Sequence, residues 1–221
     1  MTYITRDIAY SALRRMRVFY EEARQMHWRY GLELNEDLGR RNVLLSNAQE
    51  KFFSQALREW AGLKVQSDGR TGQSDIVVSL PDGTTRELEC KLTTRNTSGA
   101  VVLQTDWVTL SRKGSLDYLY VVADERFECF AVLHFEGLTT DNFRTPSSGS
   151  RGKAAMLKHT CANRCHVPIG GYHRVNDRHI SAIEQRLAGR TTPKQREKLE
   201  ARLAHWQSDP GRFEVELSYI Y

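Results

Sequence analysis

Three ionisable side chains in the middle of the chain have the types and spacing of a hydrolytic site. Residues 86–93 alternate polar and apolar side chains, which predicts a β-strand in which every second residue shares a face. Glu89 and Lys91 therefore lie on one face. The Pro-Asp-Gly-Thr sequence at 81–84 predicts a hairpin turn. A preceding strand that begins at Asp75 would then bring a second carboxylate to the same end of the hairpin.

Two carboxylates in such a position favour a bound cation. They repel each other by about 4 kcal/mol at about 4 Å for an effective dielectric of about 20. Hard oxygen ligands suit Mg²⁺, which keeps several of its waters and also accepts phosphate oxygens. A lysine beside the metal can orient or deprotonate the attacking water, or neutralise developing charge. The same alternation is also typical of an ordinary polar outer face, on which Glu and Lys pair across strands.

The elements that must position these residues follow from periodicity and from cap and turn signals. Residues 139–171 form an irregular stretch that is either functional or contains small elements. The order of elements predicts a single mixed α/β domain over 1–221. Helices are expected over 5–30, 46–62, 104–112 (with Thr105 as a possible cap), 177–188 and 193–206, and strands over 63–66, 75–80, 86–93, 116–123, 127–135 and 213–221, with a loop at 67–73.

Composition limits the class of protein. Hydrophobic residues make up 40% of the 221 residues, which is enough for a core. Without a membrane-length apolar run or an apolar stretch at the N-terminus, we expect a soluble, intracellular (cytoplasmic) protein. The segment 144–206 contains 13 Lys and Arg against 4 Asp and Glu, whereas the rest of the chain has a net charge of −4. This asymmetry favours a polyanionic partner, although a solvated basic helical surface would have the same composition.

The central residues resemble the PD-(D/E)XK nuclease superfamily, which has the restriction-endonuclease-like fold. Ser74-Asp75 is followed after fourteen residues by Glu89-Cys90-Lys91, and Ser74 stands where the family pattern has a proline. The resemblance covers residues 44–135 and implies an α/β (α+β) core, with a central mixed sheet flanked by helices. It also implies that Asp75, Glu89 and the backbone carbonyl of Cys90 bind Mg²⁺, with Mn²⁺ as a substitute.

The same resemblance implies roles for the neighbouring residues. Lys91 would position the attacking water, and Glu50 on the preceding helix would be an outer or second-metal carboxylate. Double-stranded DNA is the expected substrate, and no membrane partner is expected. A homodimer is also expected, with Phe19, Met26 and Trp28 on the first helix as a possible interface. The basic region over 139–207 would hold the DNA, through contacts that we assign to Arg95, Gln104, Arg112, Lys113, Arg151, Lys153, Lys158, Arg164 and Arg174.

A second set of residues has the types, but only loosely the spacing, of a zinc site. His159, Cys161, Cys165 and His166 lie within eight residues. Structural Zn²⁺ is therefore an alternative to two buried cysteines with histidines that face solvent or DNA. The four cysteines of the chain do not have the pattern of a disulfide framework.

The sequence thus favours a Mg²⁺-dependent DNA endonuclease of the sequence-specific, type II restriction kind. A junction resolvase, a repair or nicking endonuclease, or a transposon-associated nuclease of the same fold are alternatives. A DNA-binding module without catalysis is an alternative from another class, which the complete set of Asp75, Glu89 and Lys91 disfavours.

Overall fold

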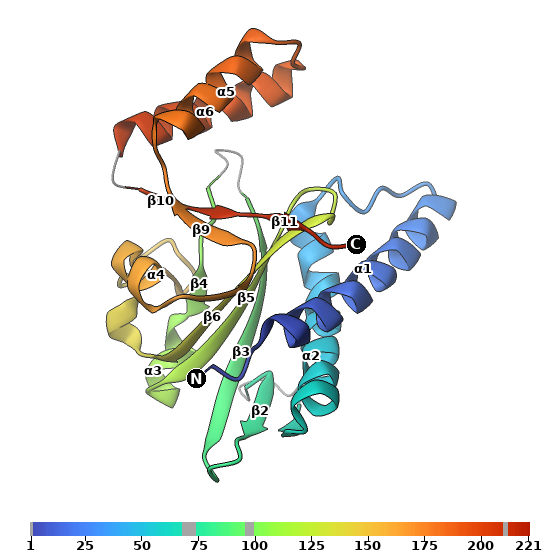
Figure 1. Cartoon of the computed structure of the whole chain (residues 1–221), viewed down its shortest axis with the longest axis vertical. Helices are drawn as coiled ribbons and strands as arrows, with labels where there is room; N and C mark the ends of the chain where they lie inside the picture. Colours follow the sequence, from blue (N-terminus) through green and yellow to red (C-terminus); the bar gives the residue numbers. More distant parts are fainter. Residues whose placement is uncertain (1, 68–73, 96–99, 210–211) are drawn as a thin grey trace.

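The fold is built on a mixed β-sheet (Figure 1). The computed structural model describes residues 2–67, 74–95, 100–209 and 212–221. The described strands of the sheet follow the order β1-β2-β3-β5-β6-β11, and β8 also pairs with β6. Their bounds are β1 Lys64–Gln66, β2 Ile76–Ser79, β3 Thr85–Thr94, β5 Leu116–Ala123, β6 Cys129–Leu138, β8 His166–Ile169 and β11 Ser218–Tyr219.

The centre of this sheet is apolar on both faces. Every residue of β5 is buried, as expected for a strand with covered faces. β3 pairs with β5 in parallel, whereas β2 pairs with β3, and β6 with β5, in antiparallel orientation. The parallel pair requires a crossover, which runs through β4 (Gln104–Asp106) and α3 (Trp107–Lys113). These pairings confirm the predicted hairpin at 81–84 and the mixed sheet.

Two long helices, α1 (Arg6–Arg29) and α2 (Leu38–Ala61), cover one face of the sheet (Figure 1). The Thr5 hydroxyl accepts from the amide of Ile8 and caps α1 at the start of the helix predicted over 5–30. The predicted start of the second helix at Ser46 is wrong. α2 begins eight residues earlier, because the Asp37 carboxylate caps its first turn by accepting from Gly39 and Arg40. Among the described residues, no helix is long and apolar enough to span a membrane.

Small elements cover the other face of the sheet. A ribbon of β4 with β7 (Lys153–Ala155), the short helices α3 and α4 (Lys158–Arg164), and the 3-10 turn η1 (Thr140–Asn142) lie there (Figure 1). The predicted helix over 104–112 is wrong in its first turn. Residues 104–106 pair with β7, and Asp106 rather than Thr105 caps α3. Thr105 is buried and bonds to the Tyr118 hydroxyl at 2.6 Å.

The C-terminal part forms a ribbon and a projecting helical hairpin. β9 (Gly171–Arg174) pairs with β10 (Phe213–Glu216), and α5 (Asp177–Ala188) packs against α6 (Pro193–Ser208). Figure 1 shows the two helices extending from the body of the molecule. They have an apolar cluster of their own. The predicted final strand over 213–221 is divided instead into β10 and β11, which join different sheets.

Candidate active site

The β2–β3 hairpin brings Asp75 and Glu89 to one end. Ile76 pairs with Leu88 in antiparallel register, so one step further Asp75 lies opposite Glu89. The Asp75 carboxylate accepts from the backbone amide of Cys90 at 2.7 Å. This bond lies just beyond the last residue of β2 that pairs with β3. The carboxylate is therefore fixed at the edge of β3, as the predicted hairpin register required.

Glu89 and Lys91 share a face of β3, as the alternation predicted. The Lys91 Nζ donates to Glu89 Oε1 at 2.5 Å, and the side chains are 31% and 13% exposed, respectively. Burial acts to lower the pKa of Lys91, but the carboxylates of Glu89 and Asp75 outweigh it and raise the pKa above its usual value. Lys91 is therefore a cation at neutral pH. This charge state favours its orienting or neutralising role over a role as a base.

Glu50, on α2, is electrostatically coupled to the same group. Burial, with a further contribution from Asp75, raises the pKa of Glu50 to about 7. Burial and the charge of Glu89 raise the pKa of Asp75 to about 6, although Lys91 and the Cys90 amide act in the opposite direction. Three carboxylates and one ammonium share a partly buried edge of the sheet, and a further cation would relieve their repulsion. We call Glu50, Asp75, Glu89 and Lys91 the acidic edge cluster.

Gln49 holds α2 in place beside this cluster, a role that the sequence did not reveal. Its side chain is buried, and its amide donates to the backbone carbonyl of Leu119 at 3.2 Å and reaches that of Lys91 at 3.5 Å. Ser46, where the sequence placed the start of the second helix, lies inside α2, and its hydroxyl donates to the Val43 carbonyl. The available signal was a glutamine beside a glutamate on the face of α2 that also carries Leu45 and Phe53.

Glu87, one step along the same face of β3, has its own partners. Ser74 and Lys113 both donate to its Oε2 at 2.5 Å. Burial acts to raise the pKa of Glu87, but the hydrogen bonds from Lys113 and Ser74 outweigh it, and the pKa is lowered. Glu87 is thus a satisfied carboxylate that ties α3 to the hairpin. Lys113, a predicted DNA contact, lies near the acidic edge cluster but is engaged in this pair.

The other predicted DNA contacts divide into exposed and engaged side chains. Arg95 is turned inward, where it pairs with the buried Glu214 at 3.2 Å. Lys158 pairs with Asp209, Lys153 lies 3.6 Å from Asp106, and Arg164 donates to the Glu136 carbonyl. The side chains of Lys158, Lys153 and Arg164 are nonetheless exposed. The remaining predicted contacts are also exposed: Gln104, Arg112, Arg151 and Arg174.

The exposed cations lie over the sheet face that carries the site. In the parallel pairing, Glu89 aligns with Tyr118 and Lys91 with Tyr120, and both tyrosines belong to the apolar cluster under α3 and β4–β7. The segment 144–176, which builds much of this face, contains six Lys and Arg and no Asp or Glu. This segment therefore brings a net positive charge to the same side of the sheet as the Glu89–Lys91 pair.

The zinc alternative gains no support from the positions of its residues. Cys161 and Cys165 pack against the apolar cluster under α4. Burial raises the pKa of the Cys161 thiol to about 11 and also raises that of Cys165, which disfavours the thiolate that zinc needs. His159 and His166 are exposed. Throughout the part of the chain that the structure describes, no three His, Cys, Asp or Glu side chains form a group that could hold a metal.

The donor set at the acidic edge cluster still suits Mg²⁺. A group of three protein ligands is not required for this ion, which is often held by only one or two carboxylates, with waters and substrate phosphates as its remaining ligands. Asp75 and Glu89 lie opposite each other and supply hard oxygens, and a bound cation would counter both the burial and the Glu89 charge that raise the pKa of Asp75. Comparisons with protein-family models, curated proteins and solved structures found no match to this chain.

Proposed function

We propose that the protein is a Mg²⁺-dependent endonuclease that hydrolyses phosphodiester bonds of double-stranded DNA. One observation carries the proposal: Asp75 and Glu89 lie opposite each other at a strand edge, with Lys91 bonded to Glu89 and Glu50 electrostatically coupled to the group. The order of helix, hairpin, helix and strands around this group agrees with the restriction-endonuclease-like pattern that the sequence resembles.

In this proposal Asp75, Glu89 and the Cys90 carbonyl hold the metal ion. When bound, the ion would polarise a water molecule and neutralise charge on the scissile phosphate. Lys91 is charged at neutral pH and would leave Glu89 to contact the water or a phosphate oxygen. Glu50, with a pKa of about 7, can accept a proton near neutral pH.

Hydrolysis requires these groups because it moves both a hydroxyl and a proton. The hydroxyl of the attacking water forms the new bond to phosphorus, and the P–O bond to one nucleotide breaks. The oxygen that leaves takes up a proton from a solvent water, and the proton of the attacking water must pass to a base. In the acidic edge cluster Glu50 is suited to accept that proton, and Lys91 to neutralise charge on the phosphate.

Duplex DNA is the preferred substrate because of the charge around the site. The exposed cations Arg112, Arg151, Lys153 and Arg174 and their neighbours are suited to hold the phosphate backbone. We extend the proposal to sequence-specific cleavage of the restriction kind, in which side chains of this basic face would read base edges. Cleavage of branched or mismatched DNA in place of intact duplex would instead favour the resolvase or repair alternatives.

Plasmid cleavage tests the proposal. Wild-type protein is incubated with supercoiled plasmids, methylated and unmethylated, in Mg²⁺ and in EDTA. We expect Mg²⁺-dependent nicking or linearisation that Asp75→Asn, Glu89→Gln and Lys91→Ala each reduce by about 10³-fold or more. Asp82→Asn, in the exposed turn of the same hairpin, should cut normally. The proposal would be refuted if wild-type protein left every plasmid intact in Mg²⁺, or if the three site variants cut as wild type does.

A further inference from the structure

The outer face of α1 has a charge pattern that is complementary to itself. Successive helix residues are about 100° apart, so Asp7, Arg14, Val18, Glu22 and Arg29 fall within about 40° of one direction. All five side chains are exposed or partly exposed, and Val18 is 61% exposed. We call these five residues the α1 stripe. The core face of α1 is on the opposite side of the helix.

The order of charges along the stripe is symmetric about Val18 with the sign reversed. Arg14 and Glu22 lie four residues before and after Val18, and Asp7 and Arg29 lie eleven before and after it. A second α1 placed antiparallel across Val18 would set Arg14 against the Glu22 of the other copy, and Asp7 against its Arg29. A parallel arrangement would place like charges together, which disfavours it.

These charges are available for such contacts. Within the described residues, none of Asp7, Arg14, Glu22 and Arg29 forms an ion pair. Of the other charges on α1, Arg24 pairs with Glu21 along the helix and Arg15 pairs with Glu59 of α2, whereas Arg6 and Arg17 have no ion pair among the described residues. The stripe therefore carries charges that have no ion-pair partner within the described part of the chain.

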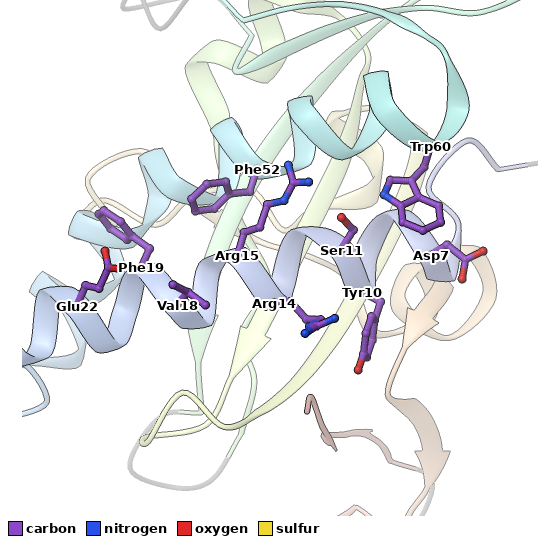
Figure 2. A pocket seen from close by; sticks show the side chains of 10 residues that line it. All are labelled: Asp7, Tyr10, Ser11, Arg14, Arg15, Val18, Phe19, Glu22, Phe52 and Trp60. Atoms are coloured by element: carbon purple, nitrogen blue, oxygen red, sulfur yellow. The ribbon is translucent and has the colours of Figure 1, made fainter.

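An apolar groove beside the stripe adds contact area. It has a volume of about 670 Å³ and runs between the outer faces of α1 and α2. Figure 2 shows Phe52 and Trp60 on α2 and Phe19 on α1, with Arg14 and Val18 on the side of α1 away from α2. Trp60 is 61% exposed, like Val18. Exposed apolar side chains that are framed by charges are typical of protein interfaces.

We infer that the protein forms a two-fold symmetric dimer through antiparallel contact of the two α1 stripes, with the α1–α2 groove of each copy covered by its partner. A two-fold interface requires a self-complementary surface, which the sign-reversed order of charges provides. This interface includes Phe19, which lines the groove, but it is centred on Val18 rather than extended to Met26 and Trp28, and charged pairs set its register. The inference does not depend on the nuclease proposal.

Charge reversal tests the inference without DNA or activity. Sedimentation velocity should show a wild-type dimer, and Arg14→Glu or Glu22→Arg should each raise its dissociation constant by about tenfold or more, since two attractive contacts become repulsive. A 1:1 mixture of the two variants should associate again, because both stripe positions are acidic in the R14E chain and basic in the E22R chain. The double variant R14E/E22R should also dimerise.

The matched control is Arg24→Glu, a charge reversal on the same helix but away from the stripe, which should leave the dimer intact. Far-UV circular dichroism checks that all variants fold. A wild-type monomer at the highest soluble concentration would overturn the inference and assign the groove to another partner. A dimer that survives both single reversals, or a mixture that stays monomeric, would also overturn it.

Discussion

Two clusters of buried charge in this molecule have opposite imbalances. The acidic edge cluster has three carboxylates and one ammonium, and burial and mutual repulsion raise the pKa values of Glu50 and Asp75. In the second cluster one buried carboxylate faces three guanidinium groups, one of them at 3.2 Å and another at 4.0 Å. We call this group the arginine cluster; it consists of Glu214, Arg95, Arg202 and Arg212.

The difference between the clusters lies in what each one joins. The arginine cluster connects α6, β10 and the end of β3, and burial lowers the pKa of Arg202 to about 10. Arg202 also stacks on the Trp206 ring at 4.4 Å. The three arginines of this cluster share the Glu214 carboxylate, so the cluster connects the α5–α6 hairpin to the sheet. The carboxylates of the acidic edge cluster have only Lys91 as a shared cation within the described residues, and this shortage is the feature expected of a metal site.

The largest effect on stability should come from the arginine cluster. Glu214→Gln leaves three partly buried guanidinium groups without their carboxylate, which should lower the free energy of unfolding by about 3–5 kcal/mol. Urea denaturation measures this change. Glu216→Gln, at an exposed carboxylate of the same strand, is the matched control and should change stability little. Equal effects of the two substitutions would show that the arginine cluster is not a structural joint.

Removal of a charge from the acidic edge cluster should stabilise the protein at high pH, whereas removal of Glu214 destabilises it. The pKa values of Asp75 and Glu50 are raised in the folded protein, to about 6 and about 7. Their contribution to stability is therefore fully present below the unfolded values, near pH 4, and is lost as the pH rises to about 7. Asp75→Asn and Glu50→Gln should each stabilise the protein at pH 8, by on the order of 1 kcal/mol after allowance for residual solvation.

Thermal unfolding between pH 4 and pH 8 measures this effect. Each substitution should flatten the pH dependence of the melting temperature relative to wild type. Asp82→Asn, at an exposed carboxylate of the same hairpin whose pKa is lowered by its bonds to Thr84, should not stabilise the protein at pH 8. A loss of stability at pH 8 in Asp75→Asn would mean that the cluster is a structural network like the one around Glu214.

The smallest effect concerns the helix that brings Glu50 to the acidic edge cluster. Asp37→Ala removes the cap of α2 and should lower the free energy of unfolding by about 1 kcal/mol. Ser46→Ala lies in the third turn of that helix and should have little effect. Chemical denaturation of both variants distinguishes the observed start of α2 from the predicted one. If Ser46→Ala lowered the free energy of unfolding more than Asp37→Ala, α2 would begin at Ser46, as the sequence predicted.

The local part of the candidate site could be predicted because its signals are local. Strand alternation placed Glu89 and Lys91 on one face, and the turn at 81–84 set the register that brings Asp75 opposite Glu89. The helical periodicity of residues 6–29 and the cap at Thr5 similarly defined α1. In each case the determining contacts lie within a few residues or within one hairpin.

The features that the sequence did not predict depend on contacts between segments that are distant along the chain. Residues 104–106 became a strand because they pair with residues 153–155, some fifty positions away. The amide of Gln49 bonds to the backbone carbonyl of Leu119, and the Arg95 guanidinium pairs with Glu214. No local pattern encodes such partners, and Arg95 was consequently predicted to contact DNA. The start of α2 was missed for a different reason, because Asp37 and Ser46 are both residue types that can cap a helix and the structure uses Asp37.

The most direct test of the metal-dependent site separates metal binding from cleavage. Mg²⁺ binding is measured by isothermal titration calorimetry, and plasmid cleavage is followed in the same buffer, for wild type, Asp75→Asn and Lys91→Ala. We expect Asp75→Asn to lose both binding and cleavage. We expect Lys91→Ala to keep Mg²⁺ binding, because the substitution removes a competing cation, but to lose cleavage. Wild-type cleavage by Lys91→Ala, or undiminished Mg²⁺ binding by Asp75→Asn, would contradict the proposed site.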